Sequence, residues 1–442
     1  MLAKQKTGYW VAGLSAGLYG YLFYFLARTD SWSLTITYTL LFGGYLLLVK
    51  NSRWQSLRWL LAVSLALRLL PFFALPALSD DFYRFIWDGR LWAAGINPFA
   101  GLPGTFLHNP ALAGKGVTQE LYHLLNSPTH YTVYPPVPQY INWLAAKLFP
   151  QSIVYTVYLL RTFTLVADMA GIGLMVLLLK KYTGKPYRVS LYAFNPLVVI
   201  ELTGNLHHEA LMIAFIMGFL YFGTQNKTAA SALMLALAVA SKLLPLMFLP
   251  FVLLRHPQRL KFLGVFSLGS LLLFLPLSEA SFFVGMQDSL TLYYQKFEFN
   301  AGLYYLLREI GYWVYGYNAI ALIGKVMFAG SMVLIIALSV VLAKKKAGFP
   351  VAFTLLYLVF ALMALILHPW YIVLLVALAP FTPFKFALVW SYFIFFTYLG
   401  YNTAGFTENY VVVGIEFAAL FIALIYDLRY YAGSSFTLNE AP

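Results

Sequence analysis

Residues 153–179 read IVYTVYLLRTFTLVADMAGIGLMVLLL, and this stretch decides the fold class of the chain. A helix that crosses a bilayer needs about 20 consecutive, predominantly apolar residues, and this run is longer than that. Its charged residues are Arg161 and Asp168, and Lys180 and Lys181 follow it directly. The stretch therefore predicts a transmembrane helix that ends at a basic, cytoplasmic turn.

Comparable apolar runs recur along the whole chain. The residues are 61% hydrophobic and 10% charged, and the mean hydropathy is +0.76, whereas a soluble domain carries about 25% charged residues. We predict an all-α polytopic integral membrane protein with about 14 transmembrane helices, within a range of about 12 to 14. The predicted spans are residues 8–27, 33–49, 57–78, 153–179, 188–203, 209–224, 228–241, 243–255, 260–277, 317–342, 349–367, 370–382, 385–400 and 410–427.

The distribution of Lys and Arg orients these spans. If the N-terminus is cytoplasmic, 18 of the 29 basic residues fall in cytoplasmic turns, including the run Lys344-Lys345-Lys346. Four more lie inside or at the edge of helices, which leaves seven for the outer side. Because cytoplasmic loops are enriched in Lys and Arg, we predict that both termini are cytoplasmic.

Two stretches, 79–152 and 278–316, cannot be spanning helices, and this topology places both on the outer face. In the first, counting the apolar piece 137–149 as a span would move the basic cluster 180–188 outside. We therefore predict that this piece is a juxtamembrane helix in the interface. The chain has no internal repeat or low-complexity linker, so we predict one membrane domain, 1–442, with a large first outer loop and a smaller second one.

The most informative segment is SDDFYRFIWDGR, residues 79–90, in the first outer loop. The chain has 16 acids, and three of them, Asp80, Asp81 and Asp88, fall within nine residues just after a predicted span. If the segment is helical, Asp81, Arg84 and Asp88 share one face and Asp80 stands at the N-cap. A capped, solvated amphipathic helix would explain this pattern structurally. Two adjacent acids at a membrane edge, however, cost desolvation energy, and this favours a functional role.

Four segments, in this order, resemble the GT-C glycosyltransferase superfamily and, within it, the bacterial polyprenyl-phosphate-mannose-dependent mannosyltransferases. The resemblance covers roughly residues 57–380. It departs from the family pattern because two helices precede the one that leads into the acidic loop, which affects the helix numbering and not the site. The segments are 80–90 with Asn97-Pro98, Asn195-Pro196-Leu197 with Glu201, Gly204, Asn205 and His207, Phe299-Asn300, and His368-Pro369-Trp370-Tyr371.

The resemblance implies an inverting enzyme on the outer (periplasmic) face of a bacterial inner membrane. It would transfer a hexose, mannose by family likeness, from a polyprenyl-phosphate carrier to a glycan, glycolipid or protein acceptor. In the family the first acid after the leading helix is the general base, and this role carries over to Asp80, with Asp81 beside it. The chemistry is consistent, because an acceptor hydroxyl must lose its proton to a carboxylate within about 3 Å as it attacks.

The leaving phosphate needs a cation to stabilise its developing charge. The predicted donor-phosphate ligands are Arg84, Arg90, Lys242, Arg308, His368 and Tyr371. The alternative for Lys242 is snorkelling to the headgroups. His368-Pro369 opens a short helix whose N-terminus favours an anion, although Tyr371 is also an ordinary interfacial aromatic residue. A divalent cation, Mg or Mn, could share the task. The chain has no cysteine, so a thiolate metal site is excluded, and no nucleic-acid partner is needed to explain the basic charge.

The remaining polar residues of these segments are predicted to bind the sugar or the acceptor. They are Asp88, Asn97, His207, His208, Glu209, Asn300 and Trp370. For His207, His208 and Glu209 the structural alternative is a polar interfacial turn, and for Trp370 it is a belt residue. Arg68, deep in an apolar run, is expected to pair with Asp168 or Glu201 rather than with substrate.

Three other functions fit parts of the pattern. A secondary transporter also has many spans and broken helices, but it would show inverted repeats and acids near the midplane. A glycan polymer ligase would depend on outer-loop Arg and His and less on paired acids. A membrane scaffold gives no reason for the charged segment 80–90.

Overall fold

The computed structural model describes residues 2–432, so residue 1 and residues 433–442 of the predicted domain lie outside the described part. The described chain is almost entirely helical, as predicted, and each predicted span overlaps a helical segment. Its first half contains α1 (Leu2–Phe25), α2 (Ser31–Ser52), α3 (Leu57–Leu69), α4 (Asp81–Ala93), α5 (Gln119–His123), α6 (Pro136–Leu148), α7 (Ile153–Tyr182), α8 (Ser190–Ala193), α9 (Pro196–Val198), the π-helical turn η4 (Val199–Gly204) and α10 (Glu209–Gly223). The second half contains α11 (Thr228–Ser241), α12 (Leu249–Arg255), α13 (Arg259–Phe274), α14 (Ala280–Gln295), α15 (Gly302–Tyr315), α16 (Ile320–Lys344), α17 (Phe349–Met363), α18 (Val373–Leu378), α19 (Phe386–Phe393) and α20 (Tyr410–Ala432).

Short 3-10 turns join or extend these helices. They are η1 (Pro103–Phe106), η2 (Pro110–Leu112), η3 (Pro186–Val189), η5 (Leu244–Phe248), η6 (Leu275–Leu277), η7 (Pro369–Ile372), η8 (Ala379–Phe381) and η9 (Ile394–Gly400). The strands of the described chain are two residues each: β1 (Tyr401–Asn402) and β2 (Gly405–Phe406) pair antiparallel, with Tyr401 opposite Phe406.

Five helical segments are long and apolar enough to cross a membrane, judged by length and composition alone. They are Ser31–Ser52, Ile153–Tyr182, Arg259–Leu277, Ile320–Lys344 and Tyr410–Tyr430. A sixth is added if Pro196–Gly204 and Glu209–Gly223, bent by 114°, form one broken span. Several other predicted spans are shorter apolar helices, some of them containing prolines such as Pro250 and Pro380, which cannot donate the helical hydrogen bond. The helices are those of a multi-pass membrane protein, while the count of 14 stays a prediction.

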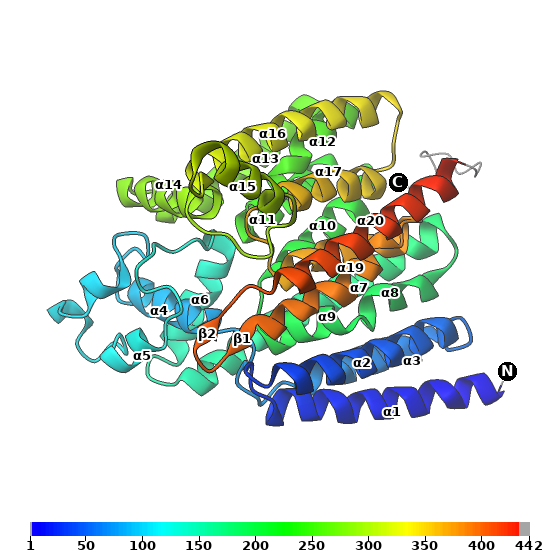
Figure 1. The fold of residues 1–442 in the computed structure, drawn as a ribbon, viewed down its shortest axis with the longest axis horizontal. Helices are drawn as coiled ribbons and strands as arrows, with labels where there is room; N and C mark the ends of the chain where they lie inside the picture. Colours follow the sequence, from blue (N-terminus) through cyan, green and yellow to red (C-terminus); the bar gives the residue numbers. More distant parts are fainter. Residues whose placement is uncertain (1, 433–442) are drawn as a thin grey trace.

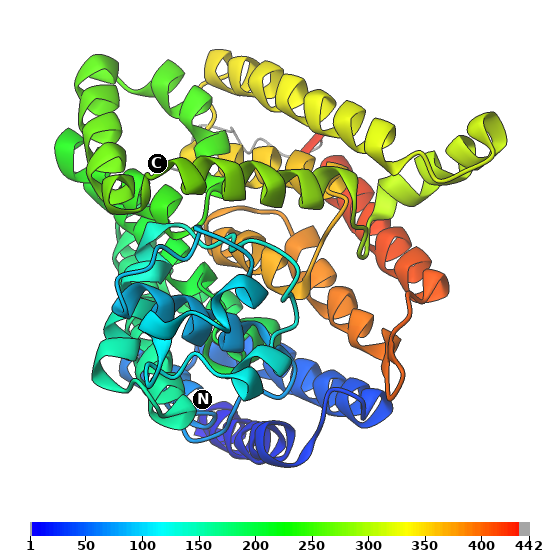
Figure 2. The same ribbon diagram turned by 90° about the vertical axis from the view of Figure 1, so that its left-hand side faces the viewer.

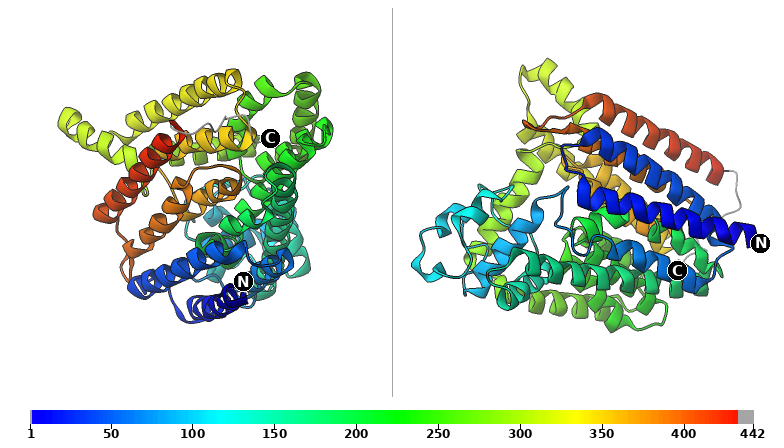
Figure 3. Two further views of the ribbon diagram at one scale, coloured as in Figure 1. Left: turned by 90° about the vertical axis from the view of Figure 1, so that its right-hand side faces the viewer. Right: turned by 90° about the horizontal axis from the view of Figure 1, so that it is seen from below.

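The helices run along the long axis of the molecule, and the segments predicted to lie outside gather at one end (Figure 1). Helices α4, α5 and α6 form a lobe there, opposite the start of α1 and the end of α20. Figure 2 views the molecule from this end, with the lobe in front and α14 close to it. In Figure 3 the pair α1 and α2 lies along one side of the bundle. The predicted juxtamembrane piece 137–149 is the helix α6.

The core of the bundle contains segments that are buried on every side, including η4 and α18. Arg68 and Asp168 meet in this core, with Arg68 Nε 2.6 Å from Asp168 Oδ2 and both side chains fully buried. The Tyr192 hydroxyl donates to the other carboxylate oxygen of Asp168. The expected partner of Arg68 is therefore confirmed. Within the lobe, α4 and α6 pack closely, because a Cβ on Gly89 of α4 would lie 2.3 Å from the carbonyl oxygen of Asn142 on α6.

Candidate active site

A cavity of about 910 Å³ lies where the lobe meets the broken helices of the bundle. Its charged and polar lining includes residues from six parts of the chain: the α1–α2 turn, the start of α4, the loop between α5 and α6, the η4–α10 break, the end of α11 and the start of η7. An apolar part of the lining comes from side chains of η5, α12, α14, α16 and α17. The polar lining includes Arg28, Asp80, Asp81, Arg84, Asn126, His207, His208, Glu209, Lys242, His368, Trp370 and Tyr371.

The two adjacent acids stand at the start of α4 and face different partners. Asp80 occupies the N-cap position, as predicted, but its side chain caps no backbone N–H. Its Oδ2 instead lies 2.7 Å from Nη2 of Arg28. Asp81 accepts a 2.6 Å hydrogen bond from the side-chain amide of Asn126, and its Oδ2 lies 3.8 Å from His207 Nε2. Both carboxylates line the cavity, so a bound hydroxyl group could reach either.

His207 reaches the acids because the chain breaks sharply after η4. Leu206, just before it, has a φ of 66°, a left-handed conformation that few side chains adopt. The Nδ1 atom of His207 lies 3.1 Å from Oε2 of the buried Glu201, and its ring stacks on Trp370 with centroids 3.8 Å apart. Among the described residues, neither ring nitrogen makes a well-aligned hydrogen bond. The imidazole therefore keeps hydrogen-bonding capacity for a ligand in the cavity.

Trp370 has both of its ring faces covered. The ring of His368 stacks on it with centroids 4.3 Å apart and planes 10° apart, while His207 also stacks on the indole. A sugar therefore cannot stack on a free indole face here. Trp370 still lines the cavity, so its contact with a substrate would have to be made through the edge of the ring.

Lys242 follows the end of α11 with an extended backbone and lines the cavity. Its ammonium pairs with the carboxylate of Glu209 at the start of α10. The ammonium also lies 4.2 Å from the centroid of the Tyr371 ring. Lys242 is followed by Leu243 and Leu244, which line the same cavity. The cation is therefore adjacent in the chain to apolar residues of the lining.

His208 and His368 are neutral groups of this site. Burial, helped by the positive charges of His207 and Lys242, lowers the pKa of each imidazole to about 3. His208 packs against Phe85, with ring centroids 4.3 Å apart. A neutral imidazole can donate or accept a hydrogen bond, but it offers a phosphate no charge.

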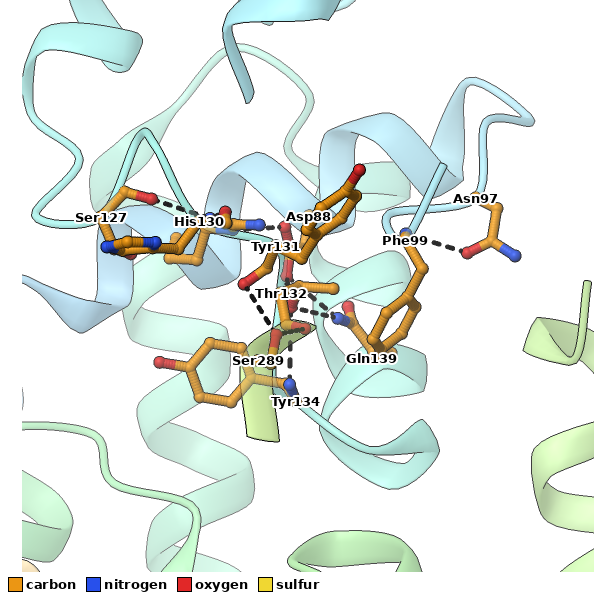
Figure 4. A network of polar contacts seen from close by, with 11 residues as sticks. Asp88, Asn97, Phe99, Ser127, His130, Tyr131, Thr132, Tyr134, Gln139 and Ser289 are labelled. Atoms are coloured by element: carbon orange, nitrogen blue, oxygen red, sulfur yellow. Dashed lines mark hydrogen bonds and ion pairs between the residues drawn. The ribbon is translucent and has the colours of Figure 1, made fainter. Parts of the chain in front are cut away.

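Asp88 lies in a polar network of the lobe with Thr132 and Gln139 (Figure 4), and Arg84 belongs to the same network. Arg84 Nε lies 2.8 Å from Asp88 Oδ1, and Arg84 also donates to the carbonyl oxygens of Ser127 and His130. The other oxygen of Asp88 accepts hydrogen bonds from Thr132 and Gln139. Asp81, Arg84 and Asp88 therefore share a helix, but Asp88 is fully buried and lies outside the cavity lining. The pair holds the loop that roofs the cavity.

Four further predicted site residues lie outside the cavity lining, each held by protein partners. Arg90 donates to the carbonyl oxygen of Gly116, and burial lowers its pKa to about 10. Asn97 donates to the carbonyl oxygen of Leu277. Asn300 binds the buried carboxylate of Glu416. Arg308 pairs with Glu298 and Glu309. The structure thus does not bring these four side chains to Asp80 and Asp81.

Sequence reasoning missed Arg28 and Tyr401, which both line the cavity. Arg28 lies in the turn between α1 and α2, and its guanidinium carbon is 4.5 Å from the centroid of the Tyr401 ring. A signal was present, because Arg28 follows the first predicted span directly on the same outer side as the acidic loop. Nothing local in the sequence indicates Tyr401, which is brought in by the β1–β2 hairpin.

No group of three or more His, Asp or Glu side chains among residues 2–432 is arranged to hold a metal ion. The nearby carboxylates are instead committed to Arg28, Asn126 and Lys242. The divalent cation considered from the sequence stays a prediction.

Comparison with known proteins identifies the family of the chain. Residues 20–257 match a sequence model described as "Alpha-(1->6)-mannopyranosyltransferase, N-terminal domain". The chain is 22% identical over 182 residues to alpha-(1->6)-mannopyranosyltransferase A of Corynebacterium glutamicum, covering 41% of this chain and 35% of the relative. It is 25% identical over 191 residues to the protein of that name in Mycobacterium tuberculosis, covering 41% of this chain and 34% of the relative.

The matched part of the chain thus spans about a third of the length of these curated relatives. No solved structure matches the chain significantly. The family match covers more than half of the chain and includes Arg28, Asp80, Asp81, His207 and Lys242. This protein belongs to the family of the alpha-(1->6)-mannopyranosyltransferase N-terminal domain.

Proposed function

We propose that this protein is an inverting glycosyltransferase that transfers mannose from a polyprenyl-phosphate carrier to a hydroxyl group of a glycan, glycolipid or protein. The observation that carries the proposal is the combination of two adjacent carboxylates with a cavity whose lining includes both a group of charged and polar residues and a group of apolar residues. The family match supports mannose as the sugar. A lipid-linked sugar has a polar sugar phosphate and an apolar prenyl chain, which match the polar and the apolar residues of the cavity lining.

The apolar part of the cavity lining suits a prenyl chain. It includes Leu246 of η5 and Phe328 and Ile336 of α16, which are exposed. This exposure supports an opening of the cavity towards the bilayer, through which the head of the carrier enters the site while its prenyl chain remains in the lipid. Burial of apolar surface contributes about 25 cal/mol per Å², so a long prenyl chain supplies much of the binding energy.

Lys242 is the best-placed ligand for the donor phosphate. It lines the cavity and is followed directly by the apolar lining residues Leu243 and Leu244, which supports a place for the head of a lipid-linked sugar beside it. A positive charge at the leaving phosphate stabilises the charge that develops as the bond to the sugar breaks. His368 and Tyr371 are neighbouring hydrogen-bonding groups, and Tyr371 already lies under the ammonium of Lys242.

The acids act on the other side of the sugar. In a single displacement the acceptor oxygen attacks the anomeric carbon opposite the departing phosphate, which inverts the configuration. We assign the removal of the acceptor proton to Asp80, with Asp81 beside it, because both carboxylates line the cavity. The new bond joins the acceptor oxygen to the sugar carbon, the carbon–phosphate oxygen bond breaks, and the proton passes to the carboxylate. His207 is positioned to bind a sugar or acceptor hydroxyl.

We further propose that the reaction takes place on the periplasmic side of a bacterial inner membrane, with about 14 spans and cytoplasmic termini. The supporting observations are the position of the lobe at the end opposite the start of α1 and the end of α20, and the basic residues that follow α7 and α16. The enrichment of Lys and Arg in cytoplasmic turns then assigns the lobe to the outer face.

The experiment is transfer from synthetic polyprenyl-phosphate-mannose by purified protein to a panel of mannosides and lipid acceptors. Wild type, D80N and D81N are compared, with E309Q as the control because Glu309 is exposed and lies outside the cavity. We expect product with inverted configuration from wild type and E309Q, and a rate at least about 100-fold lower from D80N, as for loss of a general base.

If D80N kept full transfer activity and D81N lost it, Asp81 would be the general base instead of Asp80. Absence of product from the wild type over the whole panel, together with absence of donor binding, would refute the enzyme and favour transport.

A further inference from the structure

We propose that Arg28, from the turn between α1 and α2, is a positioning residue that holds Asp80 for catalysis from the acceptor side of the site. This inference rests on the proposed function and adds to it a residue from the two helices that precede the one leading into the acidic loop. The contact that carries it is the ion pair between Arg28 Nη2 and Asp80 Oδ2, 2.7 Å long and bordering the cavity.

The guanidinium of Arg28 is fixed by two chain segments remote from its own. Asp80 binds one of its nitrogens, and the ring of Tyr401 in β1 lies under it at 4.5 Å. Burial raises the pKa of Tyr401 to about 12, so its ring is an uncharged platform for the cation. The α1–α2 turn is itself closed by Asp30, whose carboxylate accepts from the backbone N–H of Ala27. These contacts restrain a long side chain that is only 28% exposed.

The geometry fixes one carboxylate oxygen of Asp80 and leaves the other to the cavity. Within residues 2–432, the bond from Arg28 is the one side-chain hydrogen bond that Asp80 accepts, and it goes to Oδ2. A general base needs a lone pair aimed at the hydroxyl proton within about 3 Å. By holding Oδ2, Arg28 limits rotation of the carboxylate so that Oδ1 can face the acceptor. Arg is suited to this task because its planar guanidinium forms directional hydrogen bonds with carboxylates.

The geometry of the reaction places Arg28 on the side of the sugar where the acceptor binds, and not on the side of the leaving phosphate. The base and the leaving group lie on opposite faces of the anomeric carbon in a single displacement. A cation in direct contact with the base is therefore on the acceptor side, whereas Lys242, next to the apolar lining, is on the phosphate side. The two cations should consequently affect different kinetic constants.

The test compares R28Q and R28K with wild type in transfer and in binding of polyprenyl phosphate, in the full chain. The control is R53Q, because Arg53 is an exposed residue at the opposite end of α2. We expect kcat for transfer to fall about 10- to 100-fold in R28Q, as for loss of a hydrogen bond to a charged group. R28K should recover part of this loss. The dissociation constant for polyprenyl phosphate should stay within about two-fold of wild type, because the phosphate lies elsewhere.

A double-mutant cycle separates positioning from a general structural effect. If Arg28 acts through Asp80, R28Q should cost little further rate in a D80N or D80E background, since residues that act as a unit are non-additive. A full, additive loss in these backgrounds would overturn the inference, as would an unchanged kcat in R28Q. A loss of polyprenyl-phosphate binding in R28Q equal to the loss of rate would make Arg28 a phosphate ligand instead. Absence of transfer by the wild type would refute the proposed function itself.

Discussion

The ammonium of Lys242 and the carboxylate of Glu209 form an ion pair in the lining of the cavity, joining the end of α11 to the start of α10. The carboxylate is almost fully buried, while the lysine is about one-fifth exposed. This pairing keeps the lysine ammonium over the Tyr371 ring, so that it does not snorkel outward. The cation is thus held ready beside the apolar lining.

Replacement of Lys242 should weaken donor binding. We expect K242A to raise the dissociation constant of polyprenyl phosphate about 10-fold or more, as for loss of a charge-assisted hydrogen bond, and K242R to retain part of the affinity. The matched control is K227A, at the other end of the same helix. Binding is measured by titration of the purified protein with polyprenyl phosphate. Equal affinities of K242A and K227A would show that Lys242 does not bind the phosphate.

Replacement of Asp88 should loosen the roof of the cavity without touching the donor. In D88N the NH2 group of the new amide would face the N–H or O–H group of Arg84, Thr132 or Gln139, each of which now donates a hydrogen bond to Asp88. Loss of a hydrogen bond to a charged group costs about 1.5–3 kcal/mol of stability. We expect faster hydrogen exchange of residues 126–135 and slower transfer, with polyprenyl-phosphate binding retained. E120Q, in the same lobe but exposed, should exchange as the wild type does. If residues 126–135 exchanged as slowly in D88N as in the wild type, the network around Asp88 would not be what holds this loop.

Removal of Arg68 should destabilise the bundle. R68M leaves the buried carboxylate of Asp168 without its cation, and breaking a buried pair in this way costs about 3–5 kcal/mol. We expect a clearly lower thermal unfolding temperature in detergent, and a smaller loss in the double variant R68M/D168L because no charge is then left unpaired. K296M is the control, since its pair with Asp288 is 3.9 Å long and exposed. A larger loss in the double variant than in R68M would argue against this explanation.

The folded protein should lose stability in acid. The pKa of His208 and of His368 is lowered to about 3 by burial, against an ordinary value of about 6.5. Between these values the unfolded chain binds a proton at each imidazole and the folded chain does not. The stability is therefore complete above about pH 6.5 and falls by about 1.4 kcal/mol per pH unit for each imidazole as the pH decreases.

Thermal unfolding measured from pH 7 to pH 4 checks this dependence. The variant H208F can pack on Phe85 as the imidazole does, and it should show a weaker dependence on pH. H108F is the matched control because His108 is exposed, and it should behave as the wild type does. An identical pH dependence in H208F and wild type would exclude His208 as a source of the effect.

Much of the fold could be predicted from local patterns. The apolar runs identified the helical segments. The sequence places Asp80 at the N-cap if the segment 80–90 is helical, and the structure has this helix, α4, beginning at Asp81 with Asp80 at its N-cap. Which residues of the face they share reach the site could not be predicted in this way. Asp81, in the first turn of α4, lines the cavity, whereas Asp88, about two turns later, is bound by Thr132 and Gln139 inside the lobe. The difference depends on α6 and on the loop before it, which are remote in sequence.

The sequence by itself determined the class of the protein, the acidic segment and the ordered set of motifs, because run length, composition and spacing are local properties of a chain. Tertiary structure alone decided which polar residues share the cavity. Arg28 and Asp80 are 52 residues apart, and Tyr401 joins them from near the other end of the chain. Conversely, Arg90, Asn97, Asn300 and Arg308 resemble site residues in sequence but bind protein partners. The reason is physical: a side chain's partner is set by helix packing, which brings distant segments together and satisfies some polar groups while leaving others open to substrate.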